Sequence, residues 1–159
     1  MKNKKVLITS VILTILFLVF SFFFIFSNRS EDTTVFRSYT AEVFYSPDCG
    51  CCANYIKYLK DKGFNVKPIP MGNIESVKYE LKIPQNLWSC HTTKIDKYFI
   101  EGHVPIEAIK KLLEERPDID GIALPGMPYG SPGMSGFKST TFEVYKIIKG
   151  QSEDVFIRV

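Results

Sequence analysis

A run of 21 uncharged residues, 6–26, limits the fold more than any other feature of this sequence, and six of its residues are phenylalanine. As a helix rising about 1.5 Å per residue, it would span roughly 30 Å, the thickness of a bilayer's hydrocarbon core. Lys2, Lys4 and Lys5 precede the run, and positive charge favours the cytoplasmic side. We therefore expect residues 1–27 to form a cytoplasmic stub and one transmembrane anchor. The rest of the chain is then extracytoplasmic, in the periplasm or at the cell surface.

A cleaved signal peptide is the alternative interpretation of this run. The run is longer than the apolar core of about 7–15 residues that signal peptides use, and no small-x-small cleavage site follows it. Both features favour an uncleaved anchor, and both interpretations place the remaining chain on the same side of the membrane. Residues 28–39 are polar and are expected to form a tether, which leaves residues 40–159 for one folded domain.

The formal net charge of +3 does not indicate a polyanionic partner. The basic excess lies before the domain, because residues 31–159 carry 16 basic and 17 acidic side chains. No basic stripe for nucleic acid is present in this part of the sequence. We expect no nucleic-acid partner, and we expect contact with the membrane only through the N-terminal helix.

Strand and helix patterns alternate along residues 40–159. The spacing predicts strands over 40–45, 64–69, 97–102, 121–124 and 142–148, and helices over 51–62, over 74–81 and from Pro105 to before Pro117. Alternation of this kind is typical of α/β proteins with a partly parallel, mixed sheet and flanking helices. A strand, a cysteine pair at a helix start and a second strand open a thioredoxin-like fold. No helix pattern follows Gly150, although thioredoxin-like domains often end in a helix.

The run Cys49-Gly50-Cys51-Cys52 is the most informative motif. It combines Cys-x-x-Cys, the spacing of redox pairs, with Cys-x-Cys, a chelating spacing. Unpaired backbone N–H groups at a helix start favour the thiolate, which is both the nucleophile of disulfide exchange and a ligand for soft metals. The purely structural alternative for four extracytoplasmic cysteines is two ordinary disulfides. A bond inside this run would close a very small loop and stabilise little, so a functional cluster is favoured.

Soft thiolates select Cu(I), Zn(II) or iron–sulfur clusters. Zinc commonly uses two separated Cys-x-x-Cys pairs, which this sequence lacks, so copper is favoured over zinc. Cu(I) accepts few ligands, and one sulfur can bridge several ions. Cys90 is the remaining cysteine and the expected fourth ligand.

Two histidines and two methionines are further candidate ligands, and each has a purely structural role as its alternative. His91 follows Cys90, and a histidine of this kind is more often a hydrogen-bonded structural residue than a ligand. His103 lies between a predicted strand and a predicted helix, where capping or support of another ligand is as good an interpretation as ligation. Met127 and Met134 lie in a turn-rich loop, where they could capture Cu(I) or fill an irregular gap in the core.

Four motifs occur in order: Cys-Gly-Cys-Cys at 49–52, Ser-Cys-His-Thr at 89–92, Ile-Glu-Gly-His-Val-Pro at 100–105, and Ala-Leu-Pro-Gly-Met-Pro with Gly-Ser-Pro-Gly-Met at 123–134. Together they resemble the CopG-type copper-resistance proteins, a family also described as a domain of unknown function. The resemblance covers about residues 41–159. It implies a thioredoxin-like fold, an extracytoplasmic location, copper–thiolate ligation by Cys49, Cys51, Cys52 and Cys90, and cycling between Cu(I) and Cu(II) in copper detoxification. The membrane anchor differs from relatives that are soluble periplasmic proteins.

Three functions remain open at this point. The first is copper binding at the membrane, with storage, transfer to other copper-handling proteins, or copper oxidoreductase activity. The second is a thiol–disulfide oxidoreductase in which Cys49 attacks a partner disulfide and Cys52 resolves it. The third is a structural zinc or disulfide scaffold, which would unfold on chelation or reduction.

Overall fold

The computed structural model describes residues 14–22 and 35–159, and the chain divides into two compact units between Val35 and Phe36. Residues 14–22 are helical. Within the described ranges, no helix combines the length and the apolar character needed to cross a bilayer. The rest of the predicted anchor, and the tether up to residue 34, lie outside the described residues, so the anchor and the tether stay predictions.

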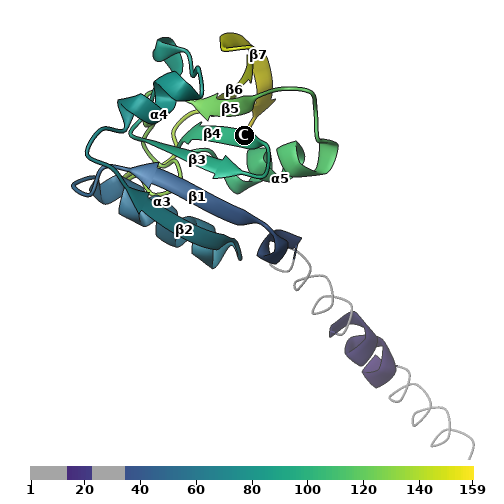
Figure 1. Cartoon of the computed structure of the whole chain (residues 1–159). Helices are drawn as coiled ribbons and strands as arrows, with labels where there is room; N and C mark the ends of the chain where they lie inside the picture. The colour runs from purple at the N-terminus through teal and green to yellow at the C-terminus, as the bar shows by residue number, and fades with distance from the viewer. Residues whose placement is uncertain (1–13, 23–34) are drawn as a thin grey trace, which may run out of the picture. The chain divides into compact units, whose positions relative to one another are not determined.

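One mixed sheet of seven strands organises the second unit, in the order β2-β1-β3-β4-β5-β6-β7 (Figure 1). Its strands are β1 (Thr40–Tyr45), β2 (Asn65–Pro70), β3 (His91–Ile95), β4 (Tyr98–Gly102), β5 (Gly121–Leu124), β6 (Glu143–Ile148) and β7 (Gln151–Arg158). The helices are η1 (Phe36–Ser38), α3 (Gly50–Asp61), α4 (Glu75–Glu80), η2 (Gln85–Leu87) and α5 (Ile106–Glu115). The pairs β1–β2 and β4–β5 are parallel, and the other pairs are antiparallel. The predicted α/β class with a partly parallel sheet and flanking helices is confirmed.

Helices cover both faces of the sheet, and the burial of its central strands follows from this. Every residue of β4 and β5 is buried. On the face of α3 and α5, Ile100 and Ile122 join the larger core cluster. On the opposite face, Phe99 and Ala123 join a smaller cluster with residues that follow α4. Successive residues of a strand point to opposite faces, so these central strands separate two apolar layers.

Helix α3 forms where the sequence predicts it. Its buried side chains recur every three or four residues, as expected for one helix face: Cys52, Tyr55, Ile56 and Leu59. Gly63 follows the helix at φ 97°, a left-handed conformation that glycine adopts without strain. The buried face of this helix therefore begins within the cysteine run, at Cys52.

Two strands were not anticipated from the sequence. Strand β3 has the sequence His-Thr-Thr-Lys-Ile, and its two threonines are buried. Strand β7 supplies the end of the domain, where no helix pattern was found, and its first four residues are exposed. Neither strand shows the alternation from which the strand at 40–45 was predicted.

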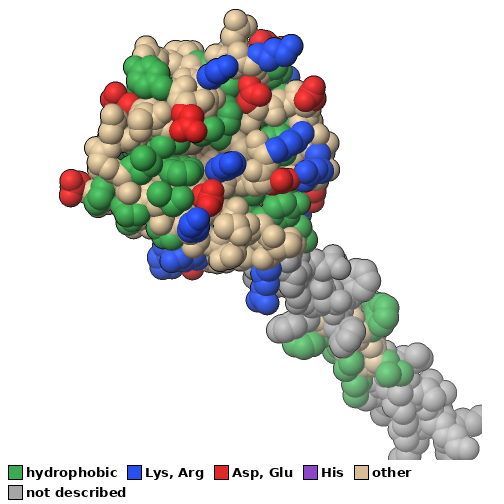
Figure 2. Space-filling model, viewed as in Figure 1, with side chains coloured by type: hydrophobic (Ala, Val, Ile, Leu, Met, Phe, Trp, Pro, Cys, Tyr) green, Lys and Arg blue, Asp and Glu red, His purple; other side chains and the backbone are tan. Residues whose placement is uncertain are grey.

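Basic and acidic side chains alternate over the visible surface of the second unit, as Figure 2 shows, without a large area of one sign. Some of them form exposed ion pairs, such as Lys67 with Glu42 at 2.9 Å across strands β2 and β1. This mixture fits the nearly balanced charge of residues 31–159.

Candidate metal centre

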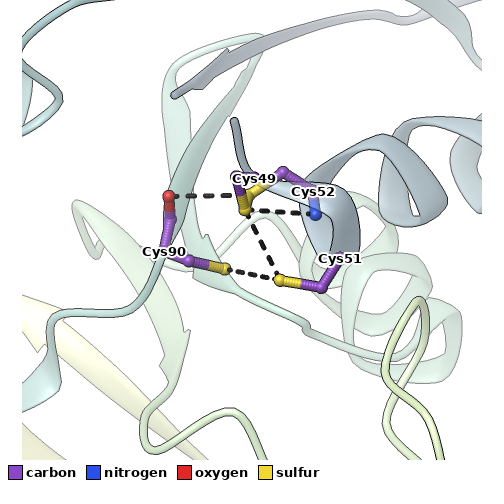
Figure 3. A group of neighbouring side chains, drawn as sticks. All are labelled: Cys49, Cys51, Cys52 and Cys90. Atoms are coloured by element: carbon purple, nitrogen blue, oxygen red, sulfur yellow. Dashed lines mark hydrogen bonds between the residues drawn. A yellow bond between two sulfur atoms is a disulfide. The ribbon is translucent and has the colours of Figure 1, made fainter. Parts of the chain in front are cut away.

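The first turn of α3 carries three of the four cysteines. Cys49 is the N-cap residue with an extended backbone, and its sulfur accepts a hydrogen bond from the Cys52 N–H at 3.3 Å. A disulfide joins Cys49 to Cys52 (Figure 3). A capping side chain and a residue three positions later lie on the same side of a first helical turn, which brings these two sulfurs together. In this oxidation state the two sulfurs are not thiolates, so a site of four thiolates requires reduction of the bond.

Cys51 and Cys90 are the free cysteines of the described chain. The Cys51 sulfur lies 3.4 Å from the Cys49 sulfur and 3.6 Å from the Cys90 sulfur. Strand β3 explains how a residue so far along the chain reaches α3. It pairs antiparallel with β1, so that His91 lies opposite Tyr45 at the end of β1 that leads to the cysteine run. Cys90, which directly precedes β3, therefore lies beside the start of α3.

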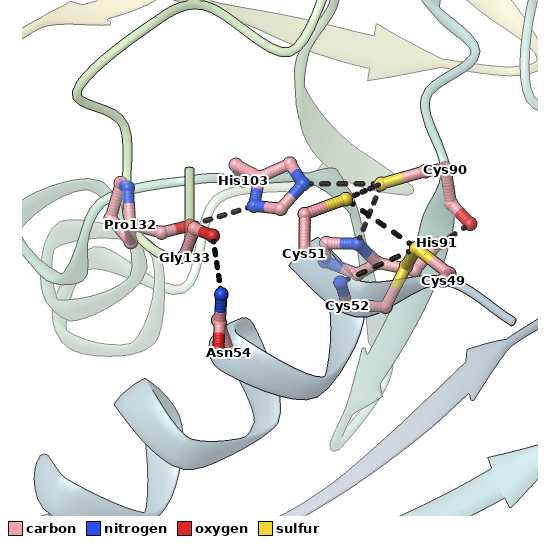
Figure 4. The surroundings of a disulfide bond; sticks show 9 residues. All are labelled: Cys49, Cys51, Cys52, Asn54, Cys90, His91, His103, Pro132 and Gly133. Carbon is pink, nitrogen blue, oxygen red and sulfur yellow. Dashed lines mark hydrogen bonds between the residues drawn. A yellow bond between two sulfur atoms is a disulfide. The ribbon is translucent and has the colours of Figure 1, made fainter. Parts of the chain in front are cut away.

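His103 completes a soft donor set with these sulfurs. Its Nε2 atom lies 3.1 Å from the Cys90 sulfur, and its Nδ1 atom lies 2.7 Å from the Pro132 carbonyl oxygen (Figure 4). The carbonyl can only accept, so Nδ1 carries the proton and Nε2 directs its lone pair at Cys90. This arrangement, in which one imidazole nitrogen donates to a backbone carbonyl and the other faces the site, is typical of histidine metal ligands.

His91, the first residue of β3, approaches the same sulfur. Its Nδ1 atom lies 3.4 Å from the Cys90 sulfur, and the side chain is fully buried. The Tyr55 ring packs against both imidazoles, with centroids 4.5 Å from His91 and 5.5 Å from His103. The Tyr55 hydroxyl donates to the Val104 carbonyl at 2.9 Å. The Tyr55 ring thus packs against both histidines and helps to fix their orientation, a role that the sequence did not suggest.

The described residues form two overlapping groups of possible metal ligands, each with its ligand atoms within 4.8 Å of one another. The first group contains Cys49, Cys51, Cys52 and Cys90, and the second contains Cys90, His91 and His103. Cys90 belongs to both. Thiolate and imidazole donors without a carboxylate are the ligands that soft ions such as Cu(I) prefer, so the residues present fit copper.

Burial decides the protonation state of this centre before a metal arrives. Burial, with the neighbouring Cys51 sulfur, raises the pKa of the Cys90 thiol to about 12. Burial also lowers the pKa of His103, against the opposing effect of the Pro132 carbonyl. At neutral pH the metal-free centre therefore holds a neutral thiol and a neutral imidazole. An entering metal ion must displace the Cys90 proton, so metal binding releases protons.

The buried His91 imidazole should make the stability of the metal-free protein depend on pH. Burial, aided by the positive charge of Lys78 and by the repulsion that a second proton on the neighbouring His103 would add, holds the pKa of His91 well below 6.5. In the unfolded chain the imidazole binds a proton near its ordinary pKa of about 6.5. Below that pH the unfolded state binds more protons than the folded state, so the free energy of unfolding falls as the pH falls. We expect this group to cost up to about 1.4 kcal/mol for each pH unit below about 6.5.

Urea unfolding of the metal-free protein between about pH 7 and pH 5 measures this dependence. His91→Asn keeps a polar group near Cys90 but does not titrate in this range, so its free energy of unfolding should fall less over the same interval. Equal pH dependence in the two proteins would show that His91 is not the responsible group.

The loop between β5 and β6 contacts the centre through its backbone. Besides Pro132, its Gly133 carbonyl accepts a hydrogen bond from the Asn54 amide of α3 at 3.3 Å. A Cβ atom on Gly133 would lie 2.8 Å from the Tyr55 backbone nitrogen, so only glycine permits this approach. Met127 is 40% exposed and Met134 is partly buried. The methionines share the loop with these contacts, and their role as ligands stays a prediction.

A buried ion pair beside the centre was not anticipated from the sequence. Lys78 of α4 and Glu101 of β4 form it, and both side chains are almost completely buried. Burial raises the pKa of Glu101, and the Lys78 charge opposes that shift. In the sequence, Glu101 directly follows three apolar residues of a predicted strand, Tyr98-Phe99-Ile100. A charged residue at such a position is the signal that could have indicated a buried ion pair.

Comparisons with known proteins support a relation to copper-resistance proteins. Residues 87–134 match the model of a protein family of unknown function, DUF411. A solved structure titled "Copper resistance protein copG- Form 2" is 40% identical, with a TM-score of 0.70, over 76% of this chain and 98% of its own. A second, titled "Copper resistance protein copG- Form 1", is also 40% identical, with a TM-score of 0.68, over 76% of this chain and 96% of its own. None of the curated proteins searched matches the chain.

The match with these two structures covers about three quarters of this chain, 76%, and nearly the whole of theirs. The family match adds the segment from η2 to Met134, which holds Cys90, His91 and His103. With this coverage and identity, the chain belongs to the family of the CopG copper-resistance proteins.

Proposed function

We propose that this protein binds Cu(I) in copper resistance, through a centre built around Cys90. One observation carries the proposal: the Cys90 sulfur lies within reach of both the Cys51 sulfur, at 3.6 Å, and His103 Nε2, at 3.1 Å. Two thiolates and one imidazole satisfy the low coordination number and the soft character of Cu(I). Reduction of the Cys49–Cys52 bond would supply two more thiolates, so that sulfurs could bridge several ions.

The proposal places this centre outside the cytoplasm, in a thioredoxin-like domain held at the membrane by residues 1–27. Its support is the uncharged run of 21 residues after three lysines. The parallel unit β1–α3–β2, with a cysteine pair at the start of α3, supports the thioredoxin-like assignment. Other copper-handling proteins on the same side of the membrane are the proposed partners.

Titration of the fully reduced full chain with Cu(I), against a chromophoric Cu(I) chelator, tests copper binding. We expect the protein to retain Cu(I) and, when it is loaded with Zn(II) first, to exchange zinc for copper. Protein whose cysteines have been alkylated is the control and should retain no copper. Retention of zinc in preference to copper would contradict the proposal.

The Cys49–Cys52 disulfide favours a second candidate, redox chemistry at this pair. In a copper oxidoreductase, the two thiolates would each give one electron to a Cu(II) ion. The products are two Cu(I) ions and one S–S bond, and two protons are released if the cysteines begin as thiols. In a thiol–disulfide oxidoreductase, the same pair would reduce a partner disulfide. Activity on a model disulfide that persists with a copper chelator present and disappears in Cys49→Ser would favour the thiol–disulfide reaction.

A further inference from the structure

Glu101 uses both carboxylate oxygens in the interior of the protein. Its Oε1 atom accepts a hydrogen bond from the Ser89 N–H at 2.6 Å and contacts the Lys78 ammonium. Its Oε2 atom accepts from the Thr92 hydroxyl at 2.6 Å, and that hydroxyl also accepts from Lys78 at 3.0 Å. Every partner except Lys78 belongs to the segment 89–92, which carries Cys90 and His91 into the metal centre.

A buried ion pair of this kind is a poor source of stability. Removing two charges from water costs about as much as their attraction returns, and well-packed apolar residues often replace such pairs without loss. The position of the pair is more informative than its energy. The one backbone N–H that the Glu101 carboxylate binds belongs to Ser89, the residue directly before Cys90.

Three consecutive residues at the end of β4 contact the segment that carries Cys90. Glu101 binds the Ser89 N–H at 2.6 Å, and His103 faces the Cys90 sulfur at 3.1 Å. Between them, Gly102 adopts φ 77°, and a Cβ atom on it would lie 2.7 Å from the Ser89 side chain. The end of β4 thus fixes the backbone before Cys90, leaves room for Ser89 and meets the Cys90 sulfur.

We infer that Glu101, held in place by Lys78 and Thr92, is a positioning residue of the metal centre that sets the Cys90 sulfur against Cys51 and His103 through the Ser89 N–H. The inference rests on the proposed copper binding, and it names the residue that holds Cys90, the ligand common to the cysteine group and the histidine group, in place. Outer-shell partners of this type orient metal ligands without touching the metal.

Two double variants separate positioning from charge. Lys78→Met/Glu101→Gln removes both charges but keeps an amide oxygen that accepts from Ser89 and an amide N–H that can donate to Thr92. Lys78→Met/Glu101→Met removes the charges and the acceptor at similar side-chain volume. With all cysteines reduced, we expect the Met/Met protein to bind Cu(I) about 10–100-fold more weakly than the Met/Gln protein, the usual effect of losing an outer-shell partner, and to lose it to a chelator correspondingly faster.

Equal rates of Cu(I) loss from two variants of matched unfolding midpoint would overturn the inference. A wild type that retains no Cu(I) would instead reject the proposed function, so the two failures are distinguishable. Asp96→Asn, at the exposed ion pair with Arg116, is the charge-removal control and should release Cu(I) at the wild-type rate.

Hydrogen exchange of the Ser89 amide in metal-free wild type tests the same contact without any variant. We expect this amide, which donates to a buried carboxylate, to exchange as slowly as the amides paired between β3 and β4. Exchange at the rate of an exposed loop amide would overturn the inference even if the variants fail to fold.

Discussion

Replacing Cys90 with serine is expected to weaken Cu(I) binding by the fully reduced protein by at least about a hundredfold, the upper end of what loss of an outer-shell partner costs. Cys90 is the member common to both ligand groups, and its sulfur links the cysteines of α3 to the histidines. A serine hydroxyl is a hard, neutral donor that does not replace a thiolate for Cu(I). Without this sulfur, the His103 imidazole no longer faces a second soft ligand.

Cys49→Ser is the matched comparison, because it also removes one cysteine and exchanges the same atoms. It abolishes the Cys49–Cys52 disulfide but leaves the contacts of Cys90 with Cys51 and His103 in place. We expect Cys49→Ser to bind fewer ions than wild type but to retain tight binding of the first. Competition with a chromophoric chelator measures both variants. An equal or larger loss of affinity in Cys49→Ser would show that the centre is not built around Cys90.

The parts of this fold that could be predicted are those whose evidence is local in the sequence. Helix α3 shows an apolar residue at every third or fourth position, and strands β1 and β5 have the predicted bounds. The cysteine run at the start of α3 is local in the same sense. Its spacing indicated a thiolate cluster, and the Cys-x-x-Cys spacing also named Cys49 and Cys52 as the pair of the redox alternative, the pair that the disulfide joins.

The parts that could not be predicted depend on pairing between distant segments. Strand β3 is polar in sequence because Thr92 faces the buried Lys78–Glu101 pair, a reason that is visible only when α4 and β4 are both in place. The orientation of His103 depends on a carbonyl 29 residues later, in a loop with no regular pattern. The sequence therefore identified candidate ligands but not the groups that hold them.

Replacing Lys78 with methionine is expected to lower the free energy of unfolding by about 3–5 kcal/mol, the usual cost of breaking a buried ion pair from one side. The Lys78 side chain is 2% exposed and that of Glu101 is not exposed at all, so water cannot screen the carboxylate that remains. Urea unfolding of the reduced, metal-free protein measures the loss. Asp96→Asn breaks an ion pair whose side chains are 49% and 41% exposed, and it should cost less than about 1 kcal/mol.

The same loss should depend on pH in a direction that identifies Glu101 as its source. Burial already raises the pKa of Glu101, and Lys78 opposes this shift, so Lys78→Met raises the pKa further. A carboxyl group with a raised pKa binds its proton more tightly in the folded state, so its folded state loses stability as the pH rises through that range. The difference between Lys78→Met and wild type should therefore be smallest in acid and largest near neutral pH. The second substitution, Glu101→Gln, removes the titrating group, so Lys78→Met/Glu101→Gln should recover most of the stability and lose this pH dependence. A deficit that stays constant with pH, or that Glu101→Gln does not relieve, would place the cost in packing around the Lys78 stem and not in the unpaired charge.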